Sequence, residues 1–560
     1  MTSAATGGDG DRNDAAKASM RGDGDRNDAG RASIPDPVRT GIARGWTVVD
    51  GTELTQDVTL EADVAIVGTG AGGGIAAETL TDAGLRVLMI EEGPLRSSSD
   101  FRMREADAYR DLYQESAARK TSDKAINILQ GRCVGGGTTV NWTSSFRTPE
   151  ATLAHWKSAN RLRGFDSAEL APWFDRIEQR LAIAAWKVAP NENNATLARG
   201  AQKLGIGASA IRRNVSGCWN LGYCGMGCPT NAKQSMLVTT IPHALDRGAT
   251  LVTRTRALRF IVRGDFVDAL ECAAMDASGT RTTARRIRVR ARTFVSAAGA
   301  IGSPALLLRS GVPDPFGIIG TRTFLHPTVV SAALMRERVD GFTGAPQTIY
   351  SDHFLSTAVD GPIGFKLEAP PIHPVLAAIT LPGHGVAHAS WMRRLPNMQV
   401  LIALLRDGFH PDSAGGRVRL ASDGTPLLDY PLTPYLFDGV RRALVAMAEI
   451  QFAAGATAVM PVHDEGEGYA SVGSARAAIG AFDLRPRATT IVSAHVMGGC
   501  ALGPDPPHAV VDETGRQHQL ANLYVLDGSL FPTSIGANPQ LSIYAITAKL
   551  ASALAGRLRS

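Results

Sequence analysis

The clearest pattern of apolar positions lies between residues 63 and 93, DVAIVGTGAGGGIAAETLTDAGLRVLMIEEG. A short β-branched run at residues 64–67 predicts a buried strand, and the next apolar stretch, residues 75–83, is rich in good helix formers. Gly84 predicts the end of that helix, and residues 86–90 predict a second strand. Strand, helix and strand in this order predict the start of an α/β domain.

The turn between the first strand and the helix matches the motif G-x-G-x-x-G at Gly68, Gly70 and Gly73. In this motif the first glycine allows a tight turn and the second lets backbone N–H groups approach a pyrophosphate. The third lets the helix pack closely on the strand. Glu91 follows the second strand, where an acidic side chain accepts hydrogen bonds from a ribose hydroxyl. The pattern therefore predicts dinucleotide binding.

Length and composition restrict the class of protein. A chain of 560 residues is too long for one hydrophobic core, so two or more domains are expected. Hydrophobic residues make up 44% and charged residues 20%, as in a soluble globular protein. A net charge of +5 over this length gives no concentrated basic field, which argues against nucleic acid as a partner.

No apolar segment long enough to cross a membrane is expected, because no uninterrupted apolar run approaches about 18 residues. No signal-peptide core follows Met1. The expected location is cytoplasmic or peripheral to a membrane, with export alongside a partner as an alternative.

The N-terminal segment has a different composition. Residues 8–19 (GDGDRNDAAKAS) recur almost unchanged at residues 22–33 (GDGDRNDAGRAS). Such sequence lacks the apolar side chains that offset the entropy of ordering, so residues 1–45 are predicted to form a disordered tail. The Asp-x-Asp spacing hints at calcium, but the Glu that closes an EF-hand loop and the flanking helices are missing.

Two further glycine-rich turns lie downstream. Residues 131–141 (GRCVGGGTTVN) predict a loop shaped for close backbone approach to something flat or charged, and an ordinary glycine-rich connection is the alternative. Residues 294–308 predict a strand, a small-residue turn at Ala298 and Gly299, and a helix. This suits an additional βα unit of the nucleotide domain.

The C-terminal region repeats this pattern. Residues 522–525 predict a strand, Asp527 and Gly528 a turn, and residues 542–558 a helix. Asn538 is a good N-cap and Pro539 is favoured at the first helical position, so these two residues are predicted to start the helix.

These motifs together resemble the glucose–methanol–choline (GMC) flavoprotein oxidoreductases. The motifs are G-x-G-x-x-G with its Glu, GRxxGGGxxxN, AAGAIGSPxLLLxSG, HxMGxC and LYVxDxSxFPTSxGxNPxL, in the family's order across residues 61–555. The resemblance implies an α/β fold with a Rossmann-like FAD-binding domain built from discontinuous segments, and an α+β substrate domain with an antiparallel sheet. The implied ranges are 46–150, 205–330 and 490–560 for the first, and 151–204 and 331–489 for the second.

The resemblance also implies the chemistry, the oxidation of an alcohol by hydride transfer to FAD, whether bound covalently or not. It assigns His495 as the base and Asn538 as its partner. A neutral imidazole suits removal of a hydroxyl proton; a structural His in a glycine-rich turn is the alternative. The implied cofactor contacts are Gly68, Gly70, Gly73, Glu91, Gly131, Gly135, Gly136, Asn141, Ala298, Gly299, Asp527, Gly528, Asn538 and Pro539. A lyase that uses FAD without redox chemistry and a non-enzymatic scaffold are rival functions.

Three of the six cysteines, Cys218, Cys224 and Cys228, fall within eleven residues. Cys followed by Pro ends the ligand run of bacterial ferredoxin-type sites, and three thiolates can hold a three-iron cluster. The spacing is similar to that of bacterial FAD-dependent glucose dehydrogenases, which implies a 3Fe-4S cluster passing electrons to a quinone or cytochrome. Reduced structural thiols are the main alternative, because GMC proteins resembling long-chain alcohol oxidases share the GYCGxGCxxxxK stretch. A disulfide or zinc are the others.

The substrate is expected to be a small-molecule alcohol. Residues 340–480 look closest to the long-chain alcohol oxidase branch, which favours a long-chain or other apolar primary alcohol; sterol, terpene, aromatic and sugar alcohols remain open. Val375, Leu376, Ile379 and Leu381 are candidates to line an apolar channel, with ordinary core packing as the alternative. The electron acceptor, whether oxygen, a quinone or a cytochrome, is not determined by the sequence.

Overall fold

The computed structural model describes residues 34–356 and 358–560. The sequence repeat of the predicted tail lies outside these residues. Helix α2 (Pro37–Ala43) begins inside the range predicted as tail, with the Asp36 carboxylate accepting a hydrogen bond from the backbone N–H of Arg39. The predicted tail boundary at residue 45 is therefore too late.

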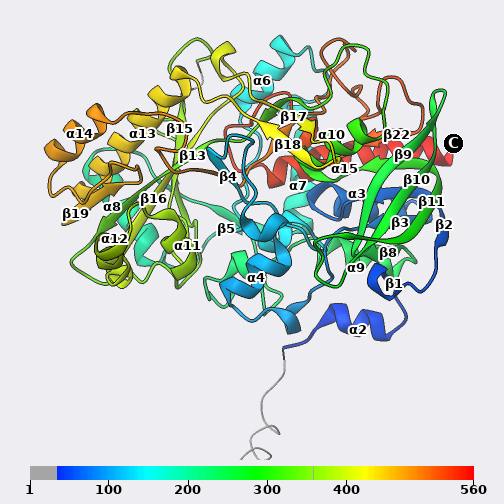
Figure 1. Ribbon diagram of the computed structural model, residues 1–560, viewed down its shortest axis with the longest axis horizontal. Helices are drawn as coiled ribbons and strands as arrows, with labels where there is room; N and C mark the ends of the chain where they lie inside the picture. Colours follow the sequence, from blue (N-terminus) through cyan, green and yellow to red (C-terminus); the bar gives the residue numbers. More distant parts are fainter. Residues whose placement is uncertain (1–33, 357) are drawn as a thin grey trace, which may run out of the picture. The chain divides into compact units, whose positions relative to one another are not determined.

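One of the two large sheets has a parallel centre (Figure 1). Its strand order is β1-β8-β3-β2-β11-β10-β9, and β22 also pairs with β11. All neighbours are parallel except the β9-β10-β11 meander, which is antiparallel. The bounds are β1 (Thr47–Asp50), β2 (Val58–Val67), β3 (Val87–Ile90), β8 (Thr250–Thr253), β9 (Thr255–Arg263), β10 (Phe266–Met275), β11 (Thr282–Ser296) and β22 (Leu523–Val525). This sheet confirms the predicted α/β fold with a Rossmann-like domain.

The first predicted βαβ unit forms β2, α3 (Ala71–Asp82) and β3. The last four residues of β2 and all of β3 are buried, because parallel strands are covered on both faces. Helix α3 starts four residues earlier than predicted, since Gly70 is already its N-cap. It packs against α9 (Thr240–Asp246) and α15 (Gln540–Arg559).

The second large sheet is mostly antiparallel, as predicted; only β4 and β20 pair in parallel. Its order is β4-β20-β13-β16-β15-β14-β6, with β19 also on β13. The bounds are β4 (Ile126–Ile128), β6 (Ser209–Ala210), β13 (Thr328–Leu334), β14 (Ile349–Ser351), β15 (Phe365–Glu368), β16 (Met398–Leu405), β19 (Ala458–Pro461) and β20 (Ile491–Ser493). Two smaller sheets contain β12 (Thr321–Phe324), β17 (Gly416–Leu420), β18 (Pro426–Asp429) and β21 (Met497–Gly498), and β5 (Ile183–Ala185) with β7 (Arg212–Asn214).

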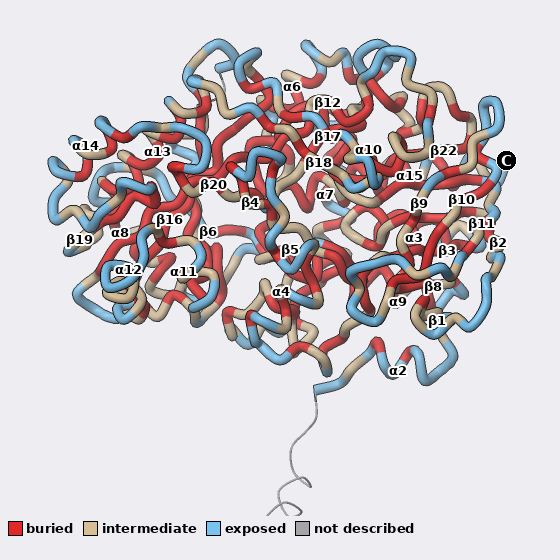
Figure 2. Tube along the Cα trace, in the orientation of Figure 1, coloured by how far each residue is buried: buried red, intermediate tan, exposed pale blue. Residues whose placement is uncertain are grey.

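The two faces of the antiparallel sheet pack differently, because side chains alternate along a strand. Leu401 and Ala403 of β16 belong to the core formed with α13 (Pro434–Ala453). Val400 and Ile402 face the opposite side, in a cluster with Ala377 of α11 (Pro374–Thr380). Figure 2 shows inner strands of both large sheets, such as β3 and β16, as buried, whereas α12 (Gly385–Met392) has no buried residue.

The remaining helices connect the sheets. They are α4 (Glu105–Leu112), α5 (Gly137–Val140), α6 (Glu150–Ala159), α7 (Ser167–Arg180), α8 (Glu192–Lys203), α10 (Gly299–Arg309) and α14 (Val472–Ala481). Among the residues that the structure describes, no helix is both long and apolar enough to cross a membrane.

The chain crosses between the two large sheets more often than the predicted domain ranges allow. Helices α6 and α7 fall in the range predicted for the substrate domain, yet Trp156 and Phe174 join the core around the parallel sheet. Strands β4, β6 and β20 fall in ranges predicted for the FAD domain, yet they belong to the antiparallel sheet. The domain boundaries therefore differ from the predicted ones at these segments.

Candidate active site

The glycine turn after β2 is built by close backbone contacts. Gly68 has φ +97°, and a Cβ on it would lie 2.3 Å from the carbonyl oxygen of Ala297. A Cβ on Gly73 would lie 1.9 Å from the carbonyl oxygen of Gly68. The first glycine thus allows the turn and the third allows close packing of α3, as the motif predicts.

The second glycine, Gly70, is not required by close contacts within the protein. A Cβ on Gly70 would meet nothing closer than the Cα of Gly136, at 3.9 Å, so the protein itself leaves room for a side chain. Gly70 is also the N-cap of α3, and no side chain caps the backbone N–H groups of the first turn. Those donors are therefore available to an anion at the helix N-terminus.

Glu91 is buried at the end of β3. Its Oε2 accepts hydrogen bonds from the backbone N–H and the Oγ1 of Thr69, at 3.1 and 2.6 Å. Its Oε1 accepts from the backbone N–H of Gly93 at 3.0 Å. Burial raises the pKa of Glu91, and these hydrogen bonds oppose that effect. The carboxyl group is thereby fixed beside the glycine turn.

A cavity with a volume of about 1060 Å³ lies among the described residues. It extends from the glycine turn and Glu91 past the loop at residues 136–141 to His495 and Asn538. Small-molecule pockets are typically about 300–1,000 Å³, so it has room for a large ligand or for a cofactor with a substrate. The predicted site residues that line it are Gly68, Gly70, Glu91, Gly131, Gly136, Asn141, Ala298, Gly299, His495, Asp527, Gly528, Asn538 and Pro539.

Two predicted contacts, Gly73 and Gly135, do not line this cavity. Gly73 is a packing position, as described above. Gly135 has φ +86°, and a Cβ on it would lie 2.3 Å from Oγ1 of Thr139. Its backbone N–H donates to Oγ1 of Thr69. Both glycines act on the shape of the loops that line the cavity.

The turns predicted at Ala298–Gly299 and at Asp527–Gly528 meet through one carboxylate. Oδ2 of Asp527 accepts from the backbone N–H of Gly299 at 2.8 Å and from Oγ of Ser303 at 2.5 Å. Oδ1 accepts from the backbone N–H of Ser529 at 2.8 Å. The end of β22 is thereby held against the start of α10.

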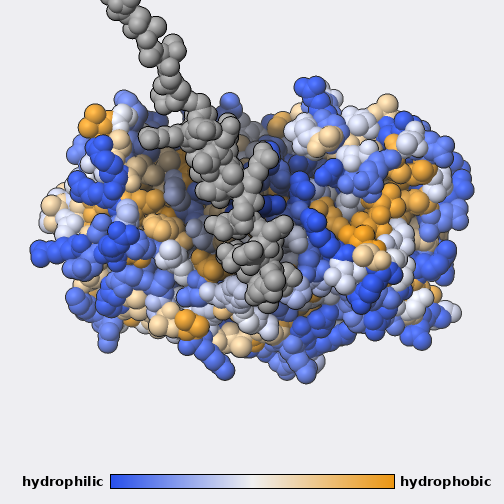
Figure 3. Space-filling model, turned by 90° about the horizontal axis from the view of Figure 1, so that it is seen from below, coloured by the Kyte–Doolittle hydropathy of each residue, from blue (hydrophilic) through white to orange (hydrophobic). Residues whose placement is uncertain are grey.

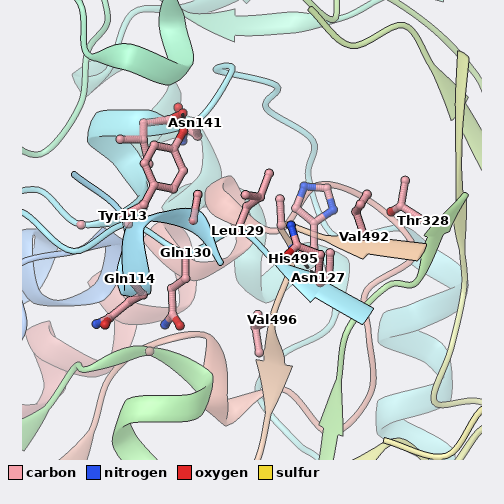
Figure 4. Close-up of a pocket in the computed structure, with 18 of the residues that line it drawn as sticks. Tyr113, Gln114, Asn127, Leu129, Gln130, Asn141, Thr328, Val492, His495 and Val496 are labelled. Carbon is pink, nitrogen blue, oxygen red and sulfur yellow. Dashed lines mark hydrogen bonds between the residues drawn. The ribbon is translucent and has the colours of Figure 1, made fainter. Parts of the chain in front are cut away.

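His495 follows β20 and faces the cavity; Figure 4 shows its ring among Leu129, Asn127 and Val492. Burial, and then the positive charge of Lys366, lower the pKa of His495 to about 4. The imidazole is therefore neutral at ordinary pH. Its Nδ1 lies 3.1 Å from Nδ1 of His326. His326 is buried and is not among the site residues predicted from the sequence.

The predicted start of the last helix is wrong at Asn538. Helix α15 begins at Gln540, Pro539 is the preceding residue and no side chain caps the helix. The Asn538 amide is held elsewhere, because its Nδ2 donates to Oε2 of Glu368 at 3.3 Å. Its Oδ1 is buried without a hydrogen-bond partner in the described protein.

Glu368 and Lys366 were not predicted. Both are buried on β15 and, being two residues apart, they lie on the same face of the strand. Burial raises the pKa of Glu368 to about 7, opposed by the charge of Lys366. Two charged residues alternating with Phe365 and Leu367 in an otherwise apolar strand are the sequence signal that could have revealed them.

The cysteine triplet lies outside the cavity lining. Sγ of Cys224 accepts from Nη2 of the buried Arg213, and Sγ of Cys228 accepts from the backbone N–H of Lys233. Nζ of Lys233 donates to the carbonyls of Thr139, Asn141 and Cys224. The cysteine loop thus braces the loop that lines the cavity.

The triplet gives the iron–sulfur prediction no support. All six cysteines are unpaired, and within residues 34–356 and 358–560 no group of three or more His, Cys, Asp or Glu side chains is placed to hold a metal ion. The contacts of Cys224 and Cys228 favour the alternative of reduced structural thiols.

The four apolar residues predicted for a channel, Val375, Leu376, Ile379 and Leu381, all line the cavity. The opposite wall is the face of the antiparallel sheet that carries Thr328, Val330, Ala332, Met398, Val400, Ile402 and Leu404. Val375 is 43% exposed and Ile379 64%, so the cavity reaches the surface at α11. Seen from below, orange residues lie among blue ones at the end of the molecule where Figure 1 draws α11 and α12 (Figure 3).

Two family models, both described as GMC oxidoreductase, match residues 109–328 and 411–547. The chain belongs to the GMC oxidoreductase family. It is therefore an FAD-dependent oxidoreductase of the class that acts on CH–OH groups. The resemblance stated from the motifs is confirmed.

Individual relatives agree with this assignment. The chain is 29% identical to the long-chain-alcohol oxidase FAO4B of Arabidopsis thaliana, over 89% of this chain and 68% of that protein. It is 30% identical to paromamine 6'-oxidase of Streptomyces fradiae, over 94% and 96%. Among solved structures, pyridoxine 4-oxidase from Mesorbium loti has a TM-score of 0.64 at 20% identity, covering 87% of this chain and 98% of that one. A point variant of formate oxidase from Aspergillus oryzae RIB40 has a TM-score of 0.68 at 14% identity, covering 90% and 100%. These structures share the fold.

Proposed function

We propose that this GMC oxidoreductase oxidises an alcohol with an apolar body to the aldehyde or ketone, with His495 as the base. The observation that carries the proposal is the make-up of the cavity. Beyond the glycine turn, the cavity holds the neutral imidazole of His495 and the amide of Asn538, whose Oδ1 has no partner in the described protein. The part of the cavity between α11 and the antiparallel sheet is walled by aliphatic side chains. A hydroxyl group would bind beside His495 and Asn538, and a hydrocarbon body between α11 and the sheet.

The residues of the glycine end fit FAD. Gly70 leaves space that the protein does not fill, and the uncapped start of α3 offers backbone N–H groups to a pyrophosphate. The Glu91 carboxylate, fixed by Thr69 and Gly93, is suited to a ribose hydroxyl. When bound, FAD supplies the group that accepts a hydride from the alcohol carbon.

The protein's own part in the reaction is to hold the hydroxyl and to take its proton. The alcohol O–H donates to the free ring nitrogen of His495, which the low pKa keeps unprotonated. Asn538, held by Glu368, presents to the cavity an Oδ1 that has no partner in the described protein.

Among the alcohols considered, a long-chain primary alcohol best suits the part of the cavity between α11 and the antiparallel sheet, called the chamber below. The α11 and sheet residues that line this part of the cavity are mostly aliphatic and offer the hydroxyl groups of Thr328 and Thr380. The charged lining residues Lys120, Lys124 and Arg487 come from other segments. A relative is named a long-chain-alcohol oxidase, which supports the same substrate class. Since the named relatives are oxidases, we propose dioxygen as the electron acceptor.

A panel of alcohols tests the substrate class. The enzyme loaded with FAD should consume oxygen with 1-dodecanol and 1-hexadecanol far faster than with glucose or choline at equal concentration. A clear preference for the sugar would overturn the apolar assignment while leaving alcohol oxidation intact.

Chain-length preference should respond to residue 332. Thr328 of β13 pairs with Val492, three residues before His495, and Ala332 lies about 13 Å farther along the strand at roughly 3.3 Å per residue. Ala332→Phe should therefore obstruct the chamber far from the hydroxyl end. We expect kcat/KM to fall about 10-fold or more for 1-hexadecanol and to change little for 1-butanol. Equal losses for both alcohols would contradict this placement of the chain.

The pH dependence should reveal the depressed pKa of His495. Because the base must be neutral, the rate of anaerobic flavin reduction should rise as pH increases through about 4, well below the ordinary histidine range. Glu368, whose pKa is about 7, is a second titrating group beside Lys366, and His326 also contacts His495. Any further change in rate near neutral pH is therefore assigned to Glu368 if it disappears in Glu368→Gln. A limb near 6.5 that persists in that variant would contradict the environment described for His495.

A further inference from the structure

His326 makes a contact that neither the motifs nor the family match assigns. Its Nδ1 lies 3.1 Å from Nδ1 of His495, and the two rings are tilted by 36° with centroids 5.3 Å apart. In a pair of neutral imidazoles joined by one hydrogen bond, one nitrogen must donate and the other accept. The contact therefore couples the proton positions of the two rings, and two arrangements satisfy it.

The fold holds His326 in a costly conformation. Its φ is +50°, in the left-handed region that side chains other than glycine rarely adopt. The buried carboxylate of Asp407 accepts from the backbone N–H groups of Leu325 and His326, at 3.1 and 3.2 Å, and from the hydroxyl of Tyr430. Oγ of Ser493 donates to the carbonyl of Leu325. Asp407 and Ser493 thus hold the corner, and Tyr430 holds Asp407.

A second cost lies at the far side of the ring. Nε2 of His326 is buried and has no hydrogen-bond partner in the described protein. An unsatisfied buried polar atom destabilises the folded state, because it loses its hydrogen bonds to water without replacement. Strain and an unpaired atom retained together at one residue are typical of functional positions, so stability alone does not explain this side chain.

We propose that His326 is a positioning residue that sets the tautomer of His495; the inference rests on the proposed function of His495 as base. Nδ1–H of His495 donates to Nδ1 of His326, which leaves the lone pair of His495 on Nε2, the nitrogen that takes the alcohol proton. The proton of neutral His326 is then on Nε2. In the opposite arrangement His495 would carry Nε2–H and could not act as a base.

The first test is spectroscopic and needs no turnover. In enzyme labelled with ¹⁵N-histidine, the ring resonances of His495, identified by their loss in His495→Ala, should show the proton on Nδ1. His326→Asn keeps an acceptor near the position of Nδ1 and tolerates a positive φ, so it should preserve this tautomer. His326→Leu removes the acceptor and should shift the proton of His495 toward Nε2. Wild-type His495 protonated on Nε2 would overturn the proposal.

The second test is kinetic. His326→Leu should lower the rate of anaerobic flavin reduction by about 10-fold or more with little change in KM, and His326→Asn should recover most of it. His155→Leu, a half-buried histidine that does not line the cavity, is the matched control and should be neutral. A folded His326→Leu with wild-type rate and tautomer would overturn the role. Failure of the proposed function is separate, because it would appear as normal turnover in His495→Ala.

Discussion

His495→Ala is expected to lower the rate of flavin reduction by alcohol by about 10²-fold or more, because general-base catalysis typically contributes about 10²–10⁴-fold. The substitution removes the one imidazole that lines the cavity among the described residues. It should leave FAD bound, since the glycine turn and Glu91 are formed by other segments. Stopped-flow reduction under anaerobic conditions, with FAD content measured on the same sample, provides the comparison.

His155→Ala is the control for removing a histidine, and it should reduce flavin at the wild-type rate. A His495→Ala enzyme that binds FAD and still reduces it at a near-normal rate would show that another group takes the proton. A loss of FAD together with activity would instead assign His495 to the fold of the site.

Gly70→Val should lose FAD binding but keep its stability, whereas Gly73→Ala should lose stability. Gly70 has an ordinary φ of −70° and space around its missing Cβ, so valine should leave the free energy of unfolding of the FAD-free protein within about 0.5 kcal/mol. Its side chain would enter the cavity where backbone N–H groups approach the pyrophosphate, so we expect the purified protein to lack FAD. Gly73→Ala places a methyl 1.9 Å from a backbone oxygen and should destabilise the FAD-free protein by about 1–3 kcal/mol or more.

The pair is measured by denaturant unfolding of the FAD-free proteins and by FAD content after purification. Gly70→Val protein with a full complement of FAD would contradict the placement of the cofactor at this turn. Gly73→Ala protein as stable as the wild type would contradict the close packing of α3.

The parts of the fold that could be predicted are those determined by neighbours in sequence. The strand, glycine turn and helix at residues 64–83 follow from local periodicity, although the strand and the helix both start earlier than predicted, at Val58 and Ala71. The turn at Asp527 was also predicted, although its hydrogen bond to Gly299, more than two hundred residues away, was not visible in the sequence.

Long-range competition explains the errors. Asn538 has the sequence of an N-cap, but the buried Glu368 on a strand 170 residues away holds its amide. His326, Lys366 and Glu368 were missed for the same reason, since only the folded sheet brings them to His495 and Asn538. The domain ranges failed where short strands such as β4 and β20 join a sheet assigned to the other half of the chain.

The cysteine triplet shows that spacing alone leaves more than one role open. The spacing of Cys218, Cys224 and Cys228 resembles a cluster-binding run, but their neighbours include Arg213 and Lys233, buried cations that also bond backbone carbonyls. These contacts support the alternative of reduced structural thiols, and the cluster stays a prediction.

The most direct test of the account is anaerobic addition of 1-dodecanol to the FAD-loaded enzyme, followed by its absorbance and by analysis of the organic product. We expect the flavin absorbance near 450 nm to bleach, with about one equivalent of dodecanal formed per flavin reduced, as the stoichiometry of a two-electron oxidation requires. An unbleached flavin with every alcohol of the panel, or alcohol consumed without reduction of the flavin, would contradict the proposed oxidation.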